Sequence, residues 1–311
     1  MSATSANKDD FFAQTAVPER FSEKYELMKE FVSKHRAIGN RVVLVSSGGT
    51  TVPLESRTVR FIDNFSIGTR GSASAEYPLY FLQHGYAVIF LYRLRSLEPY
   101  SRHLQRRLMD MLEVKGDSVT VKHDHTSSLK SILQQYEGVK AKDLLLSIDF
   151  TSLAEYLHLL RASAQILNAI HSKALLYLAA AVSDFYIPKH EMPEHKIQSS
   201  TDKPLQLSLQ LVPKMLKPLV KEWAPDAFVV SFKLETDRNI LIKKALSALD
   251  KYQHQVVIAN LLDTRKYEVV LVTKETEKPI LLSKEDSDKG LEIEEEIVKQ
   301  LIARHKHFIE S

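Results

Sequence analysis

The sequence predicts an α/β fold: a doubly wound, mostly parallel, Rossmann-like sheet with an antiparallel addition near its C-terminus. Strand-like and helical patterns alternate along the chain, which is the order of elements in such folds. The strand-like runs are apolar throughout, as in YAVIFLY at 86–92, which is typical of strands buried on both faces. Gly, Asn, Asp and Ser residues follow their C-terminal ends, where sheets of this kind bind ligands.

The pattern assigns elements in chain order. Strands are expected at 41–46, 86–92, 143–149, 173–182, 205–211, 227–232, 255–260, 267–273 and 279–283. Helices are expected at 21–39, 70–84, 102–113, 127–136, 152–170, 237–252 and 293–302, with a further helix opened by Pro213. Pro78 is expected to kink or split the second of these helices and Gly85 to end it, while Ser152 and Glu155 form a capping box.

The last two strands predict the antiparallel addition. They lie too close together in sequence for a crossover helix, so they are expected to form a hairpin, which is a candidate dimer contact. Within the 311 residues we expect an N-terminal helical extension at 1–40 and a single α/β domain at 41–311.

Composition excludes several classes of function. A net charge of +3 is too small to indicate a nucleic-acid partner, and the chain lacks the apolar run of a membrane helix. The absence of cysteine excludes disulfides, thiolate catalysis and Cys-ligated metals, and it fits a reducing compartment. Because the N-terminus lacks a signal-peptide pattern, we expect a cytosolic protein with neither a membrane nor a nucleic-acid partner. The basic segment 93–107 is interpreted as a solvated connection, with a groove for anions as the alternative.

Two glycine-rich elements follow the first strand. Gly48 and Gly49 end that strand in SSGGTT, and NFSIGTRG then places Ser66, Gly68 and Gly71 directly before a helix. Bare backbone N–H groups and a helix N-terminus both favour an anion, so the pair predicts a polyphosphate between the two elements. The chain contains neither G-x-G-x-x-G nor the P-loop pattern, and SSGGTT alone would be an ordinary turn.

Two further positions are candidates for binding a substrate. Asn64 lies among Phe61, Ile62 and Phe65, and an amide in apolar surroundings requires a partner, although a turn residue is the alternative. In AAAVSDFY at 179–186 the small side chains of alanines would let a ligand approach the backbone, with Asp184 at the rim. Close helix packing and a turn aspartate are the alternative.

Three residues at later positions complete the set. Lys196 lies on a polar loop and would suit a phosphate, while Phe232 and Asn260 each end a strand and would suit a purine. Each of the three would be unremarkable alone. The histidines form no metal-binding pattern, and the serines lack the context of a catalytic triad.

Together these stretches resemble a known family. SSGGTTVPLESRTVRFIDNFSIGTRG, YLAAAVSDFYIP, EMPEHKIQS, SFKLETD and QVVIAN occur in the order found in phosphopantothenate–cysteine ligase of the monofunctional eukaryotic type, over roughly residues 40–275. The resemblance implies that 4′-phosphopantothenate is joined to L-cysteine through an acyl-adenylate, with ATP as co-substrate, Mg²⁺ on its phosphates and a homodimer as the assembly. ATP is expected over CTP because the chain lacks the fused decarboxylase of the bacterial CTP-dependent relatives.

The resemblance also assigns roles to residues. The nucleotide would be bound by Gly48, Ser66, Gly68, Gly71, Phe232 and Asn260. Phosphopantothenate and its acyl intermediate would be held by Asn64, Ala180, Ala181 and Asp184. Asn64, Arg60 and Lys196 would act in catalysis, the last two as positive charge for phosphate or carboxylate. No protein ligand to the metal is expected.

Two other functions remain open at this point. A nicotinamide-dependent oxidoreductase would need G-x-G-x-x-G and an acidic residue after the second strand, where this chain has Tyr92 and Arg93. A non-catalytic relative that binds nucleotide or phosphopantothenate would share every motif used above, so only an activity measurement separates it from the ligase.

Overall fold

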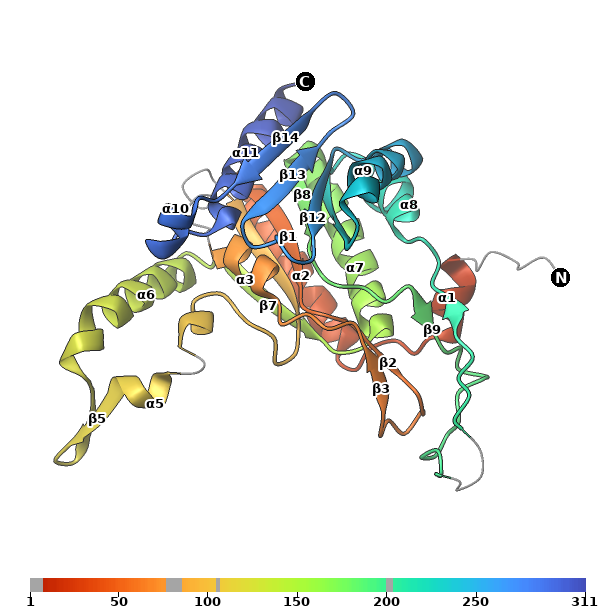
Figure 1. Cartoon of the computed structure of the whole chain (residues 1–311), viewed down its shortest axis with the longest axis horizontal. Coiled ribbons are helices and arrows are strands. Elements are labelled where there is room, and N and C mark those ends of the chain that lie inside the picture. Colours follow the sequence, from red (N-terminus) through yellow and green to blue (C-terminus); the bar gives the residue numbers. More distant parts are fainter. Residues whose placement is uncertain (1–7, 77–85, 105–106, 200–203) are drawn as a thin grey trace.

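The computed structural model describes residues 8–76, 86–104, 107–199 and 204–311. Within these residues the central sheet has eight strands in the order β14-β13-β12-β11-β8-β1-β4-β7 (Figure 1). All neighbouring pairs from β12 to β7 are parallel, whereas β13 pairs antiparallel with both β12 and β14. The bounds are β1 Arg41–Ser47, β4 Tyr86–Arg93, β7 Leu145–Phe150, β8 Ala174–Leu178, β11 Phe228–Glu235, β12 Val256–Leu261, β13 Glu268–Val272 and β14 Glu277–Leu281. The predicted fold class is confirmed, including the antiparallel C-terminal addition.

Helices cover both faces of the sheet. Along β1, Val42 and Leu44 point into one apolar core and Val43 and Val45 into another, because successive side chains of a strand alternate between faces. The first face carries α2 Phe21–Ala37, α7 Leu153–Leu167 and α9 Arg238–Tyr252, and the second carries α3 Thr69–Glu76 and α11 Ile293–Glu310. The predicted capping box is present at the start of α7, where Ser152 accepts from the backbone of Glu155. This capping box fixes where α7 begins.

The N-terminal helices share the main core. Phe11 of α1 (Lys8–Gln14) and Met28 and Phe31 of α2 are buried in the same cluster as the sheet residues. No helix of the described residues is long and apolar enough to cross a bilayer.

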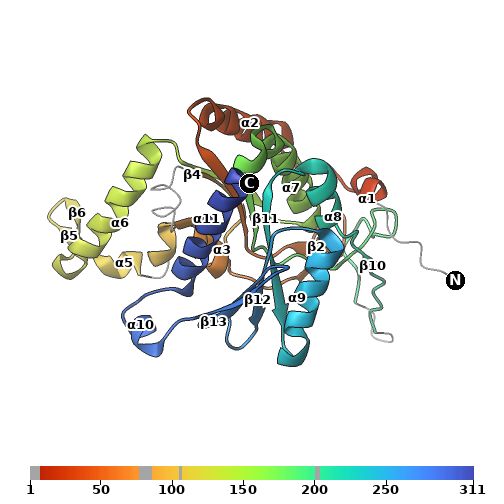
Figure 2. The same ribbon diagram turned by 90° about the horizontal axis from the view of Figure 1, so that it is seen from above.

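The other described elements lie outside the sheet and its main helices. They are β2 Thr51–Pro53 with β3 Phe61–Asp63, β5 Leu112–Lys115 with β6 Ser118–Val121, β9 Phe185–Tyr186 with β10 Gln210–Leu211, the helices α5 Leu108–Met111, α6 His123–Ala141, α8 Leu216–Pro218 and α10 Lys284–Asp288, and the turns η1 Ser101–His103, η2 Asn168–Lys173 and η3 Leu219–Trp223. The β5–β6 hairpin, flanked by α5 and α6, lies away from the sheet in both views (Figure 1 and Figure 2).

Some of the predicted elements were wrong. The long loop after β1 contains the β2–β3 hairpin. In place of the helix predicted at 102–113, the described residues form the turn η1, the four-residue helix α5 and the start of strand β5. The strand predicted at 205–211 is reduced to the two residues of β10, and α6 is longer than the predicted 127–136. The expected kink at Pro78 and helix end at Gly85 lie outside the described residues.

Candidate active site

Most of the predicted site residues lie at one edge of the sheet. Because β12, β11, β8 and β1 are parallel neighbours, their C-terminal ends are adjacent. Gly48 follows β1, Ala181 follows β8, and Phe232 and Asn260 lie within β11 and β12. The backbone joins the first two directly, since the Ala181 N–H donates to the Gly48 carbonyl at 2.8 Å. The sheet therefore brings together residues more than 200 positions apart.

The two glycine-rich elements pack directly against each other. A Cβ on Gly49 would lie 1.8 Å from the backbone oxygen of Asn64, and one on Gly71 would lie 2.4 Å from Ser47. Gly48 and Gly68 have φ values of +86° and +82°, a left-handed conformation that glycine adopts without strain. Close backbone contact thus requires these glycines whether or not a phosphate binds, and their role toward the nucleotide stays a prediction.

A buried hydroxyl that the sequence did not reveal lies where the two glycine-rich elements meet. The Oγ of Ser96 would be 3.1 Å from a Cβ on Gly48 and 3.2 Å from one on Gly68, and it has no hydrogen-bond partner among the described residues. Buried hydroxyls are rarely left unpaired, so this one has hydrogen-bonding capacity left beside the two glycines. Nearby, the Ser66 hydroxyl accepts from the Gly68 N–H at 3.3 Å, just before α3 begins.

Asn64 is held by its backbone. Its N–H donates to the Thr50 carbonyl at 3.1 Å, and its side chain is half-buried without a hydrogen bond to any residue of the described ranges. The neighbouring Asp63 pairs with Arg93 at 2.6 Å, which ties this loop to the end of β4. The amide of Asn64 is thus available to a ligand while its main chain is fixed.

Two arginines of the basic segment 93–107 are held in ion pairs within the protein. Arg93 is 19% exposed in its ion pair with Asp63, and the Arg102 guanidinium, 10% exposed, donates to both oxygens of Glu292 at 2.7 and 2.6 Å. Arg102 also pairs with Glu76. The charges of these two arginines are neutralised within the protein, whereas Arg95 and Arg107 are exposed, as expected of a solvated connection.

A buried carboxylate connects the two predicted basic residues. Glu55, with 0% exposure, accepts from the backbone N–H groups of Val59, Arg60 and Ile197 at 3.0–3.3 Å and from the Arg60 guanidinium at 2.8 Å. Arg60 also donates to the Ile197 carbonyl at 3.1 Å. Burial acts to raise the pKa of Glu55, but the three N–H donors and Arg60 together hold it below its usual range. Lys196, the residue before Ile197, is exposed beside this network.

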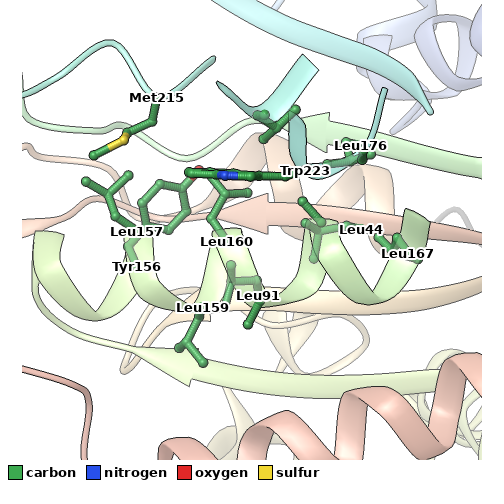
Figure 3. Packing of buried hydrophobic residues seen from close by; sticks show 14 of the residues in the cluster. Leu44, Leu91, Tyr156, Leu157, Leu159, Leu160, Leu167, Leu176, Met215 and Trp223 are labelled. Carbon is green, nitrogen blue, oxygen red and sulfur yellow. The ribbon is translucent and has the colours of Figure 1, made fainter. Parts of the chain in front are cut away.

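A cavity of about 310 Å³ opens at the same sheet edge, between β8, β11 and α7. Figure 3 shows Met215 and Trp223 lying on the side of α7 that carries Tyr156, Leu157 and Leu160. All of these except Trp223 line the cavity and form its apolar wall. The other lining residues include Ala180, Asp184, Ser231 and Phe232. Asp184 pairs with Lys214 at 2.7 Å and is exposed at the rim, as its position after the strand predicted.

Phe232 lines the cavity whereas Asn260 does not, and their role toward a base stays a prediction. The Phe232 ring meets Tyr177 edge-on at 5.0 Å and lines the cavity, so it is fixed in orientation. Asn260 is 6% exposed, and its Oδ1 has no partner among the described residues. An unpaired buried acceptor fits an amino group or a hydroxyl of a nucleotide. In the part of the chain that the structure describes, no cluster of three His, Asp or Glu residues could hold a metal ion.

Comparisons with known proteins decide the family. Residues 158–306 match the DNA/pantothenate metabolism flavoprotein C-terminal domain family. Phosphopantothenate–cysteine ligase of Mus musculus is 50% identical over 307 residues, 96% of this chain and 97% of that protein, and the Homo sapiens ligase is 51% identical over 291 residues, 91% of this chain and 92% of that protein. The chain belongs to the phosphopantothenate–cysteine ligase family.

A solved structure agrees with this placement. A Cab2 mutant in complex with phosphopantothenate-cysteine superposes with a TM-score of 0.89 at 40% identity, covering 97% of this chain and 98% of that one. The resemblance read from the sequence motifs is therefore confirmed, and the chain is an enzyme of the ligase class. Membership of the phosphopantothenate–cysteine ligase family places it apart from nicotinamide-dependent oxidoreductases.

Proposed function

We propose that the chain joins 4′-phosphopantothenate to L-cysteine with ATP as co-substrate, in the cytosol and as a step of coenzyme A biosynthesis. The products would be 4′-phosphopantothenoylcysteine, AMP and pyrophosphate. The observation that carries the proposal is the family membership over nearly the whole chain, combined with a sheet edge that gathers the predicted binding residues.

The reaction would proceed in two halves. A carboxylate oxygen of 4′-phosphopantothenate attacks the α-phosphorus of ATP, and pyrophosphate leaves to give an acyl-adenylate. The cysteine amine then attacks the acyl carbon, loses a proton and expels AMP. Neither half needs a protein nucleophile, because positioning and electrostatic stabilisation carry reactions of this kind. A chain without cysteine and without a histidine or serine triad is consistent with that requirement.

This chain's residues would do the positioning. Asn64 would donate its amide to the reacting carboxylate, and Arg60 and Lys196 would offset the negative charge of the two substrates that meet there. Phe232 and Asn260 would hold the base, since the first lines the cavity and the second has a free buried acceptor. A Mg²⁺ ion, when bound, would neutralise charge on the phosphates, with ligands mostly from substrate and water.

We extend the proposal to a homodimer in which a second copy covers exposed apolar side chains around the β2–β3 and β9–β10 hairpins (Figure 1). These side chains are Val59, Phe61, Phe65, Ile67, Phe185, Leu205, Leu207 and Leu211. Phe65 is 83% exposed, and a second copy that covered these side chains would remove apolar surface from water. Asn64 and Asp184 are sequence neighbours of this surface, so the second copy would complete the phosphopantothenate end of the site.

The assembly can be measured directly. Sedimentation equilibrium of the full chain is expected to give about twice 35.5 kDa, and Phe65→Asp with Leu211→Asp is expected to give the monomer mass because two charges would be buried in the interface. Val114→Asp on the β5–β6 hairpin, another exposed apolar position, is the control and should remain dimeric. A monomeric wild-type chain at micromolar concentration would exclude the dimer.

The activity itself has a decisive assay. Incubation with 4′-phosphopantothenate, L-cysteine, ATP and Mg²⁺ should yield AMP and the amide product, each measured by mass spectrometry, and kcat/KM should be higher with ATP than with CTP. A chain that binds both substrates but forms neither product would be a non-catalytic relative. Equal or reversed kcat/KM values for the two nucleotides would show that Phe232 and Asn260 do not select a purine.

A further inference from the structure

One polar pair at the cavity has no role in the reaction described above. Ser231, on the strand β11 next to Phe232, lines the cavity, and its Oγ lies 2.8 Å from the Nε2 of His254. No other hydrogen bond of the Ser231 hydroxyl is made to the described residues. A hydroxyl has one donor and two acceptor positions, so this one has capacity left for a ligand.

His254 is buried and neutral. It is 2% exposed, and burial lowers its pKa to about 4, so at neutral pH its ring has one N–H and one bare nitrogen. Its Nδ1 has no partner among the residues described. The two tautomers therefore differ in free energy. With the proton on Nδ1 a buried donor is left unpaired, whereas with the proton on Nε2 only an acceptor is left unpaired, which is the more tolerated case.

The second tautomer fixes the direction of the whole pair. The Nε2–H of His254 then donates to the Ser231 oxygen, and the Ser231 O–H is free to donate into the cavity. A hydroxyl that already accepts a hydrogen bond is a stronger donor, because successive hydrogen bonds polarise one another. The pair thus presents one oriented, polarised donor to whatever molecule lies against Ala180 and Phe232.

We propose that Ser231 is a binding residue whose hydroxyl donates to an acceptor atom of a substrate in the cavity, and that His254 is a positioning residue that orients this hydroxyl. The acceptor belongs either to the nucleotide or to 4′-phosphopantothenate, both of which offer such atoms, and the inference rests on the proposed function for this choice of molecules. Tyr252 lines the same cavity and packs on His254 with ring centroids 6.4 Å apart, which helps to hold the imidazole in place.

The test measures binding apart from turnover. Dissociation constants for a non-hydrolysable ATP analogue and for 4′-phosphopantothenate are determined by calorimetry for the wild type, Ser231→Ala, His254→Leu, His254→Gln and the Ser231→Ala/His254→Leu double variant. For one of the two molecules, Ser231→Ala and His254→Leu should each weaken binding about tenfold, as the loss of one hydrogen bond in a closed site does. The double variant should be no weaker than Ser231→Ala, since both changes act through the same hydroxyl.

His254→Gln separates orientation from packing. Its side-chain amide can still donate to Ser231, so it should restore most of the affinity that His254→Leu loses, and a purely structural histidine would give no such difference. Ser247→Ala, an exposed serine on α9, is the matched control and should bind as the wild type does. Nitrogen-15 spectra of labelled histidine should show the proton of His254 on Nε2.

The outcomes are distinguishable. Dissociation constants within twofold of wild type for both molecules in Ser231→Ala would overturn the proposal, as would an Nδ1-protonated ring or a His254→Gln variant no better than His254→Leu. Absence of turnover in the wild type would instead refute the proposed function. Tm is also recorded for every variant. A fall in Tm together with weaker binding of both molecules would indicate a general loss of folding, and this outcome would also count against the proposal.

Discussion

Replacing Asn64 with alanine is expected to lower turnover by about thirtyfold to a thousandfold, or about 2 to 4 kcal/mol at the transition state, as the loss of one preorganised donor often does. The backbone of Asn64 is fixed by its 3.1 Å bond to Thr50, and its side chain is not committed to any described residue. A donor held in this way needs no reorganisation when charge develops, which is why its loss should appear in kcat more than in KM. Steady-state kinetics with all three substrates measure the change.

Two controls separate catalysis from folding. The thermal midpoint of Asn64→Ala should equal that of the wild type, because the substitution removes no hydrogen bond from the protein interior. Asn239→Ala, an exposed asparagine on α9, should leave both kinetics and stability unchanged. If Asn64→Ala retains turnover within twofold of the wild type, Asn64 is only a turn residue.

The sheet was predictable because its strands carry a strong local signal. Runs such as that of β4 are apolar on both faces, and only burial between two helical layers explains them. The β5–β6 hairpin lacks that signal: Val114 and Val119 are exposed, so its strands show no continuous apolar run, and the sequence predicts a helix at 102–113 and an irregular connection after it. The two-residue loop Gly116–Asp117, with φ of +59° at Gly116, was a hairpin signal that could have corrected the assignment.

The site residues also differ in whether the sequence could predict them. The glycines and the strand-end residues could be predicted from the sequence, because their positions follow from the alternation of strands and helices. Glu55 was missed, since nothing near it in sequence indicates that a lone glutamate will be buried against Ile197, 142 residues away. The Ser231–His254 pair likewise depends on a contact between a strand and the turn after α9, which only tertiary structure shows.

Replacing Glu55 with alanine is expected to be the most destabilising change near the site. The substitution removes the buried acceptor of three backbone N–H groups and of the Arg60 guanidinium, which is 39% exposed. Leaving several donors without their buried acceptor is strongly destabilising, and a fall in Tm on the order of 5 to 10 °C follows for a protein of this size. Activity should fall as well, because the segment that carries Lys196 loses the bond of Ile197 to Glu55.

Two matched variants test whether the buried carboxylate is the cause of the expected fall in Tm. Glu55→Gln keeps the shape and one acceptor oxygen, so it should be less destabilised than Glu55→Ala. Glu194→Ala removes an exposed carboxylate of the same segment, paired with Arg57 at 3.3 Å with both side chains more than half exposed, and should leave Tm nearly unchanged. Differential scanning calorimetry measures all three. If Glu55→Ala and Glu194→Ala have the same Tm, the buried carboxylate does not hold these loops together.

The pH dependence of stability provides a test of the charge itself. Because the pKa of Glu55 is lowered in the folded protein, its carboxylate contributes stability that is fully present above the pKa of an unfolded glutamate, about 4.3, and is lost as the pH falls through the folded value. Glu55→Gln has no such titration. The difference in Tm between the wild type and Glu55→Gln should therefore be constant near neutral pH and shrink below about pH 4.3. A difference that does not depend on pH would mean that the shape and packing of Glu55, and not its charge, stabilise the protein.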